Sequence, residues 1–134
     1  MTRLFVERSN AGDAEGVALL YEEDAVMAYP PGSQTVGRAA IHALWEKVLA
    51  ARPHFEPEEP LPTLVSGAIA LTSTPPKDGT GARAQVIRRQ PDSSWLRVLD
   101  QPEFTTGRRT GTAAIPSLTC RRLEVASVSC SKVC

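Results

Sequence analysis

Apolar positions recur with a helical period in the first half of the chain. From Ala14 to Tyr21 they fall at i, i+3, i+4 and i+7, and Asp13 precedes them as a candidate helix N-cap. A stronger pattern lies between Gly37 and Pro53, where apolar residues return at i, i+3, i+4, i+7 and i+8: Ile41, Leu44, Trp45, Val48 and Leu49. Together with a short N-terminal segment, this half of the chain predicts three short helices.

Three consecutive acids, residues 22–24, separate the second helix from an apolar run. Acidic side chains are disfavoured at the carboxyl end of a helix, so we interpret these acids as a helix stop and a solvated turn. Residues 25–29 then continue as an extended segment. Pro30 and Pro31 end it, because proline cannot donate to a strand ladder.

The pattern changes to strands after Pro53. Residues 63–74, 82–90 and 95–104 are rich in β-branched or alternating apolar residues, and turn residues separate them. Gly67 indicates a tight turn or a bulge inside the first of these segments. The proline-rich residues 54–62 form an edge strand at most. Because the turns are short, the strands are expected to pair as an antiparallel meander.

Composition divides the 134 residues into a body and a tail. Residues 1–104 hold all seven aromatic residues and an acidic excess, whereas residues 105–134 hold all three cysteines and a basic excess. We predict a folded domain over 1–104 and a weakly ordered basic, Cys-containing tail over 105–134. An added packed strand or an out-of-frame segment are alternatives for the tail.

The net charge and the length of the apolar stretches also argue against some classes of partner. The net charge is zero, so nothing in the overall charge argues for nucleic acid or an anionic membrane surface. No apolar stretch approaches the roughly 20 residues that a membrane span requires. We therefore expect no nucleic acid, no membrane and a cytoplasmic location.

Three segments in this order resemble the SnoaL-like superfamily, whose wider fold is that of nuclear transport factor 2: "AGDAEGVALLYEEDAVM", "VGRAAIHALWEKV" and "RRQPDSSWLRVLDQPEF". The resemblance implies an α+β fold, the cystatin-like α+β cone, in which N-terminal helices pack on a curved antiparallel sheet and leave an apolar pocket. It also implies a homodimer that pairs through the sheet.

Asp100 is the titratable residue most suited to chemistry. It lies at the end of the last predicted strand, with the parity of Leu96 and Val98, so we expect it at the mouth of the pocket. A carboxyl there can move a proton to or from a carbon acid or a hydroxyl. Related enzymes in the superfamily, such as ketosteroid isomerase and polyketide cyclases, use a pocket Asp as base. The alternative is an Asp that caps a turn or pairs with Arg83 or Arg97. No second acid or Tyr stands at a matching position to assist it.

Six further side chains are predicted to line the pocket: Tyr21, Met27, Tyr29, Trp45, Gln85 and Val98. The alternative for most of the aromatic and apolar ones is core packing alone, and Tyr29 could simply stack on the prolines that follow it. The arginines of the last two strands are expected to form a solvated or dimer-facing surface. No spacing of His, Cys and carboxylates predicts a metal site, and no cofactor is expected.

Three classes of function remain open. The first is a protein that binds a small apolar or aromatic ligand, without assigned chemistry. The second is a cofactor-independent enzyme of the isomerase or cyclase type that uses Asp100 as general acid/base. The third is a dimerisation scaffold that has no ligand.

Overall fold

A computed structural model describes residues 1–77 and 81–104 of the chain. The predicted tail 105–134 lies outside the described residues, as does the centre of the turn at 78–80. The elements, in chain order, are α1 (Thr2–Asn10), α2 (Ala14–Ala18), β1 (Tyr21–Met27), β2 (Thr35–Val36), α3 (Arg38–Ala50), β3 (Leu64–Ser66), β4 (Ile69–Thr74), β5 (Ala82–Arg89) and β6 (Trp95–Phe104). The three helices and the later strands confirm the pattern read from the sequence.

The strands form one six-stranded sheet in the order β2-β1-β6-β5-β4-β3. Strands β3 to β6 pair as the antiparallel meander that the short turns predict. Strand β1 instead runs parallel to β6, so the sheet is mixed and not wholly antiparallel as expected. A parallel pair needs a long crossover connection, and the chain between β1 and β6 supplies one through α3 and the meander.

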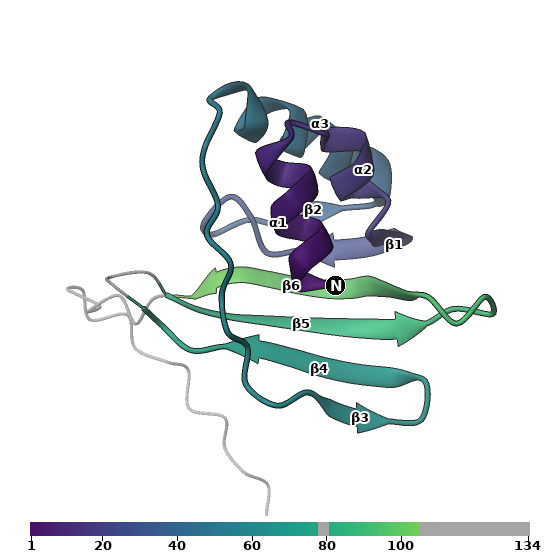
Figure 1. Ribbon diagram of the computed structural model, residues 1–134. Coiled ribbons are helices and arrows are strands. Elements are labelled where there is room, and N and C mark those ends of the chain that lie inside the picture. Colours follow the sequence, from purple (N-terminus) through teal and green to yellow (C-terminus); the bar gives the residue numbers. More distant parts are fainter. Residues whose placement is uncertain (78–80, 105–134) are drawn as a thin grey trace, which may run out of the picture.

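All three helices gather on one side of the sheet, towards its β1–β6 end (Figure 1). We call the side that packs against the helices the inner face and the opposite side the outer face. The core lies between the two layers, and its largest fully buried side chains are Tyr21, Met27, Ile41 and Val17. The helices packed against the inner face therefore form the α+β cone.

The predicted start of α2 and both predicted ends of α3 are confirmed, but α2 ends at Ala18, so the prediction that the helix continues to Tyr21 was wrong: Tyr21 begins β1. The backbone N–H of Gly16 donates to Asp13 Oδ1 at 2.8 Å, which confirms Asp13 as the N-cap of α2. Helix α3 begins directly after Gly37, whose φ of 91° lies in the region that favours glycine. It ends at Ala50, three residues before Pro53.

The acidic stretch forms part of β1 and is not a solvated turn, so that prediction was wrong. Glu22 is only 7% exposed. It lies 3.3 Å from Arg88 Nη1, and it accepts a hydrogen bond from Gln90 Nε2 at 2.8 Å. The residues that compensate this acid come from β5 and the turn after it, so the local helix argument could not detect them.

The segment 53–63 forms no strand and connects α3 to β3 across the side of the sheet that carries the helices (Figure 1). Asn10 holds it at Phe55 with two hydrogen bonds, of 2.9 and 2.8 Å. Further along, Glu58 pairs with Arg83 of β5. We call residues 53–63 the connecting segment, and it forms one wall of a hollow described below.

Candidate functional site

A β-bulge in β6 decides which side chains reach the inner face. Between two neighbouring pairs, β5 advances by one residue, from Ile87 to Val86, while β6 advances by two, from Arg97 to Leu99. One additional residue shifts the in-and-out alternation of a strand. Arg97 and Asp100 therefore share the inner face although they are three positions apart.

Because of this bulge, two predictions made from the sequence are wrong. Asp100 does not lie on the face predicted from its even spacing to Leu96 and Val98. The additional residue of the bulge shifts the alternation of side chains before Asp100 is reached. Arg97 is not part of a solvated arginine surface either, since it is only 4% exposed, as is Asp100. Both residues lie under the helices, and the alternative of an Asp100–Arg97 pair is the one that the contacts support.

A hydrogen-bonded polar cluster surrounds Asp100. The Tyr21 hydroxyl donates to Asp100 Oδ2 at 2.5 Å. Arg97 Nη1 donates to the same oxygen at 3.2 Å and to the Tyr21 hydroxyl at 2.9 Å. Gln85 Nε2 donates to Asp100 Oδ1 at 3.2 Å, and the Thr72 hydroxyl donates to Gln85 Oε1 at 3.0 Å. We call these five residues the polar cluster.

The cluster is neutral as a whole because Arg97 and Asp100 carry opposite charges. Burial by itself lowers the pKa of Arg97, but the neighbouring Tyr21 and Asp100 raise it above its ordinary value. The guanidinium therefore stays charged. Burial raises the pKa of Tyr21 well above its ordinary value, the Asp100 carboxylate adds to the shift, and Arg97 opposes it. The Tyr21 hydroxyl thus remains a protonated donor at neutral pH.

Tyr21 is the partner that sequence reasoning did not find for Asp100. It was predicted as a pocket residue, but the expectation that no Tyr stands at a matching position to assist Asp100 was wrong. The parallel register sets Tyr21 opposite Arg97, which brings the phenol to a carboxylate 79 positions away in the chain. No pattern in consecutive residues carries that information.

Aromatic rings cover the cluster on the helix side. The guanidinium carbon of Arg97 lies 4.6 Å from the centre of the Phe5 ring and 5.3 Å from that of the Tyr21 ring. The Phe5 ring in turn meets the rings of Trp45 and Phe55 edge-on, at 5.2 and 5.7 Å between centres. Phe5 and Phe55 were not among the predicted site residues, and their apolar character is the one signal that could have suggested them.

Two buried N–H donors beside Phe5 have no hydrogen-bond partner among the described residues. They are Nε of Arg97 and the indole nitrogen of Trp45. An unpaired buried donor costs about 1–3 kcal/mol of desolvation. Such groups are rare in folded proteins, so these two call for a physical explanation.

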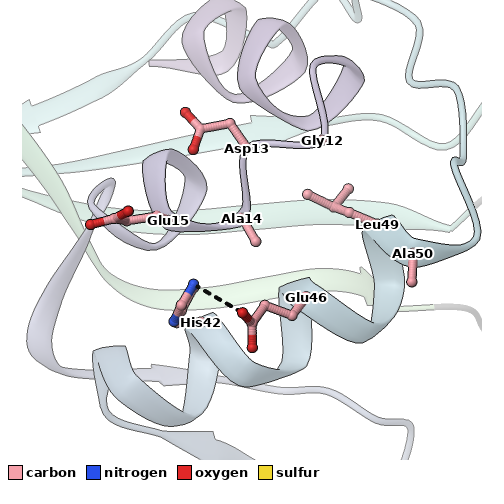
Figure 2. Close-up of a pocket in the computed structure, with 8 residues that line it drawn as sticks. All are labelled: Gly12, Asp13, Ala14, Glu15, His42, Glu46, Leu49 and Ala50. Carbon is pink, nitrogen blue, oxygen red and sulfur yellow. Dashed lines mark ion pairs between the residues drawn. The ribbon is translucent and has the colours of Figure 1, made fainter.

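Two hollows open on the helical side, and the polar cluster lines neither of them. The first, of about 570 Å³, lies between α2 and α3 (Figure 2). Its polar lining includes His42 and Glu46, which lie 3.7 Å apart, and Asp13, which already caps α2. Within residues 1–77 and 81–104, no group of three His, Cys, Asp or Glu side chains is arranged to hold a metal ion.

The second hollow, of about 560 Å³, lies between α1 and the connecting segment. Thr2 and Val6 line it from the helix, and Glu58 lines it from the segment. The helix also contributes the charged residues Arg3 and Glu7 to the lining, whereas Phe5, whose ring covers Arg97, does not line this hollow.

The structure places the other predicted pocket residues in different parts of the fold. Met27 and Trp45 are buried in the core, and Gln85 belongs to the polar cluster. Tyr29 is exposed at the end of β1, where its carbonyl accepts from the Thr35 hydroxyl at 2.7 Å. Val98 is half-buried in the bulged part of β6. The structure thus brings Asp100, Tyr21 and Gln85 together, whereas Tyr29 lies apart from them.

Solved structures place this architecture among the cystatin-like folds. An NTF2-like protein with a cystatin-like fold from Novosphingobium aromaticivorans aligns at a TM-score of 0.55 with 27% identity, covering 72% of each chain. A protein from Streptomyces avermitilis described as a putative dehydratase of the NTF2-like family aligns at a TM-score of 0.56 with 19% identity, covering 74% of this chain and 86% of the other.

The family follows from the sequence model of the SnoaL-like domain, which matches residues 2–108. The chain belongs to this SnoaL-like family, and the resemblance noted in the sequence is confirmed. Epoxide hydrolase LasB from Streptomyces lasalocidi is 34% identical over 82 residues, which is 60% of this chain. The match spans only 29% of that relative's length. Among the described residues, none of the helices has both the length and the apolar content to cross a membrane.

Proposed function

We propose that the protein binds a small apolar or aromatic molecule through the second hollow, with the polar cluster at the inner end of the site. The observation that carries this proposal is the hydrogen-bonded cluster of Tyr21, Arg97 and Asp100 buried on the inner face. Ligand sites are concave and mostly apolar, with a few convergent polar groups. Aromatic rings beside a neutral set of donors and acceptors fit that description.

Blocking the second hollow tests this proposal. Val6 lines the hollow, so Val6→Trp should fill the entrance, whereas Leu4→Trp places the same ring at an exposed position of the same helix. We expect ethylbenzene or acetophenone to shift backbone amide NMR signals of α1 and β5 in the wild type and in Leu4→Trp, but not in Val6→Trp. No shift in the wild type at millimolar ligand would contradict binding and leave the scaffold without a ligand as the better description.

Proton transfer by Asp100 is the second candidate function. Asp100 Oδ2 is engaged by Tyr21 and Arg97, whereas Oδ1 accepts only the 3.2 Å contact from Gln85. Oδ1 could therefore take a proton if Gln85 moved. The name of the relative, epoxide hydrolase, suggests a reaction in which water adds to an epoxide carbon. Asp100 would accept the proton of that water and return it to the opened ring oxygen.

Styrene oxide provides a direct assay for this second candidate, with the diol as product. General acid–base catalysis contributes roughly 10²–10⁴-fold, so Asp100→Asn should lower the rate by at least about 100-fold while retaining binding. Asp92→Asn, in an exposed turn, serves as the matched control. Equal rates in both variants and in the wild type would remove Asp100 from the chemistry.

We further propose that the protein forms a homodimer through the outer face of the sheet. Paired positions place one apolar side chain on each of the six strands, in a continuous row: Val36, Val26, Leu99, Val86, Leu71 and Leu64. Val36, Leu99, Leu71 and Leu64 are 60%, 49%, 38% and 66% exposed, whereas Val26 and Val86 are half-buried. A cytoplasmic location stays a prediction from the sequence.

A second copy is the occupant that fits this row. Six strands about 4.8 Å apart extend over about 24 Å, so a face roughly 20 Å deep projects about 500 Å². Two such faces together approach the roughly 1,000 Å² that a specific interface requires. A two-fold axis near the middle of the row would set apolar residues against apolar residues along its whole length.

Sedimentation of the full chain at tens of micromolar tests the dimer. We expect Leu99→Lys to give a monomer, because it places a charge in the middle of the row. Leu61→Lys should remain a dimer, since Leu61 is equally exposed but lies on the connecting segment. A monomeric wild type, or a dimeric Leu99→Lys, would overturn this part of the proposal.

A further inference from the structure

The connecting segment, residues 53–63, forms neither helix nor strand and is short of backbone donors. Four of its eleven residues are prolines, which have no N–H to donate. At Phe55, two hydrogen bonds join its backbone to the Asn10 side chain. At Leu61, the backbone N–H donates to the Ser73 carbonyl at 2.8 Å. Most residues of the segment are exposed, so its attachment depends on a small number of contacts.

The segment is attached on both sides of the polar cluster. At one end, the Phe55 ring meets the Phe5 ring, which covers the guanidinium of the cluster. At the other end, Glu58 pairs with Arg83, which lies two positions before Gln85 on β5 and therefore on the same face. The segment crosses the helix side of the sheet between these points (Figure 1). Because the polar cluster lines neither hollow, a ligand reaches it only if a covering element moves.

We propose that the connecting segment is a strap that opens as one unit while the helices and the sheet stay folded, and that this opening lets a ligand pass from the second hollow to the inner face. Only the second half of this inference rests on the proposed binding function. Pro57, Glu58 and Pro60 line the second hollow, so moving the strap widens that hollow towards β5. Segments with exposed residues and few regular backbone hydrogen bonds open at a lower free energy than the core.

Hydrogen exchange read at the end that was not altered tests whether the strap opens as a unit. Asn10→Ala removes both hydrogen bonds to Phe55. It should speed exchange of the Leu61 amide about five- to tenfold, although the bond from Leu61 to Ser73 is untouched. The Ala11 amide, which donates to the Glu7 carbonyl in α1 at 3.1 Å, should keep its rate.

The reciprocal experiment weakens the other end. Glu58→Gln removes the charge that pairs with Arg83 and should speed exchange of the Phe55 amide about threefold. Glu59→Gln makes the same change at the exposed neighbouring position and should leave both ends at their wild-type rates. Acceleration confined to the altered end would contradict a strap that opens as a unit. Acceleration of the Ala11 amide in Asn10→Ala would overturn the claim that the helices stay folded.

The kinetics of ligand binding test the passage. Asn10→Ala should raise the association and dissociation rates of ethylbenzene by the same factor as the exchange of the Leu61 amide. The dissociation constant should stay unchanged, because the free and the ligand-bound protein lose the same two hydrogen bonds. Glu59→Gln is again the control. NMR titrations of the full chain, analysed for exchange between free and bound protein, give both rates.

The outcomes separate this inference from the proposed function. Wild-type rates in Asn10→Ala would overturn the passage through the strap and leave the binding function standing. If ethylbenzene does not bind the wild type at millimolar concentration, the binding function and the passage both fail. The hydrogen-exchange result still decides whether the strap opens, since that measurement uses the protein without a ligand.

Discussion

The inner and outer faces of the same sheet differ in where they put charge and where they put apolar surface. The inner face holds Arg97 and Asp100 under the helices, although burying two ions carries a large desolvation cost. The outer face leaves Leu71 and Leu99 partly in contact with solvent, although burying them would stabilise the fold. Stability alone explains neither arrangement, whereas a polar ligand site inside and a partner outside would explain both.

The largest expected effect comes from breaking the charge pair of the inner face. Arg97→Met would leave the Asp100 carboxylate buried without its counter-ion, so the free energy of unfolding should fall by about 3–5 kcal/mol. Arg89→Met, at an exposed position on β5, should change it by less than about 0.5 kcal/mol. Urea denaturation of both variants measures the difference. Equal losses would contradict a buried pair on the inner face.

Two isoleucine substitutions, one on each face, compare the stability contributions of the faces without changing any charge. Ile87 is 6% exposed on the inner face and Ile69 is 39% exposed on the outer face. Ile87→Ala should cost about 2–4 kcal/mol, because it removes packed methyl groups and leaves a cavity. Ile69→Ala should cost less than about 1 kcal/mol at low protein concentration. A dimer would make the cost of Ile69→Ala grow with concentration, which thermal unfolding at several concentrations detects.

Alkaline pH should weaken the inner face through Tyr21. Its pKa in the folded protein is raised by burial above the ordinary value of about 10, so the unfolded chain loses this proton first. The stabilisation is therefore fully present below about pH 10 and decreases as pH rises above it, by about 1.4 kcal/mol per unit. Urea midpoints between pH 8 and 11 should show this decline in the wild type and in Tyr29→Phe. A decline of the same size in Tyr21→Phe would assign it to other groups.

The smallest expected effect lies at the far end of the polar cluster. Thr72→Val keeps the shape of the side chain and removes the hydroxyl that donates to Gln85, so we expect a loss of about 1 kcal/mol. Ser73→Ala changes the next residue, which faces the outer side, and should be nearly neutral. Chemical denaturation compares the two. A neutral Thr72→Val would mean that the cluster ends at Gln85.

Much of the architecture was predictable because it depends on neighbouring residues. The apolar period of α3, the N-cap at Asp13 and the turn at Gly67 each arise within a few consecutive positions. The same local reasoning failed for Glu22, whose partners Arg88 and Gln90 come from the other half of the chain. It also failed for the parallel pairing of β1 with β6.

The candidate site was predictable only in part. Asp100, Tyr21 and Gln85 were each selected from the sequence, but as separate side chains around an apolar pocket. Their contacts with one another, and the inclusion of Arg97, depend on a bulge of one residue in β6. Strand alternation read from the sequence has no means to detect such a bulge, so it placed Arg97 on the wrong face.

The sequence by itself determined the helices, the meander, the family and the residue types available for a site. Each of these follows from periodicity, turn chemistry or motifs within short stretches of chain. Only the tertiary structure decided that Tyr21, Arg97 and Asp100 meet, and that six apolar side chains align on the opposite face. Both results depend on the register between strands that are far apart in the sequence, and register is fixed when the whole sheet packs against its helices.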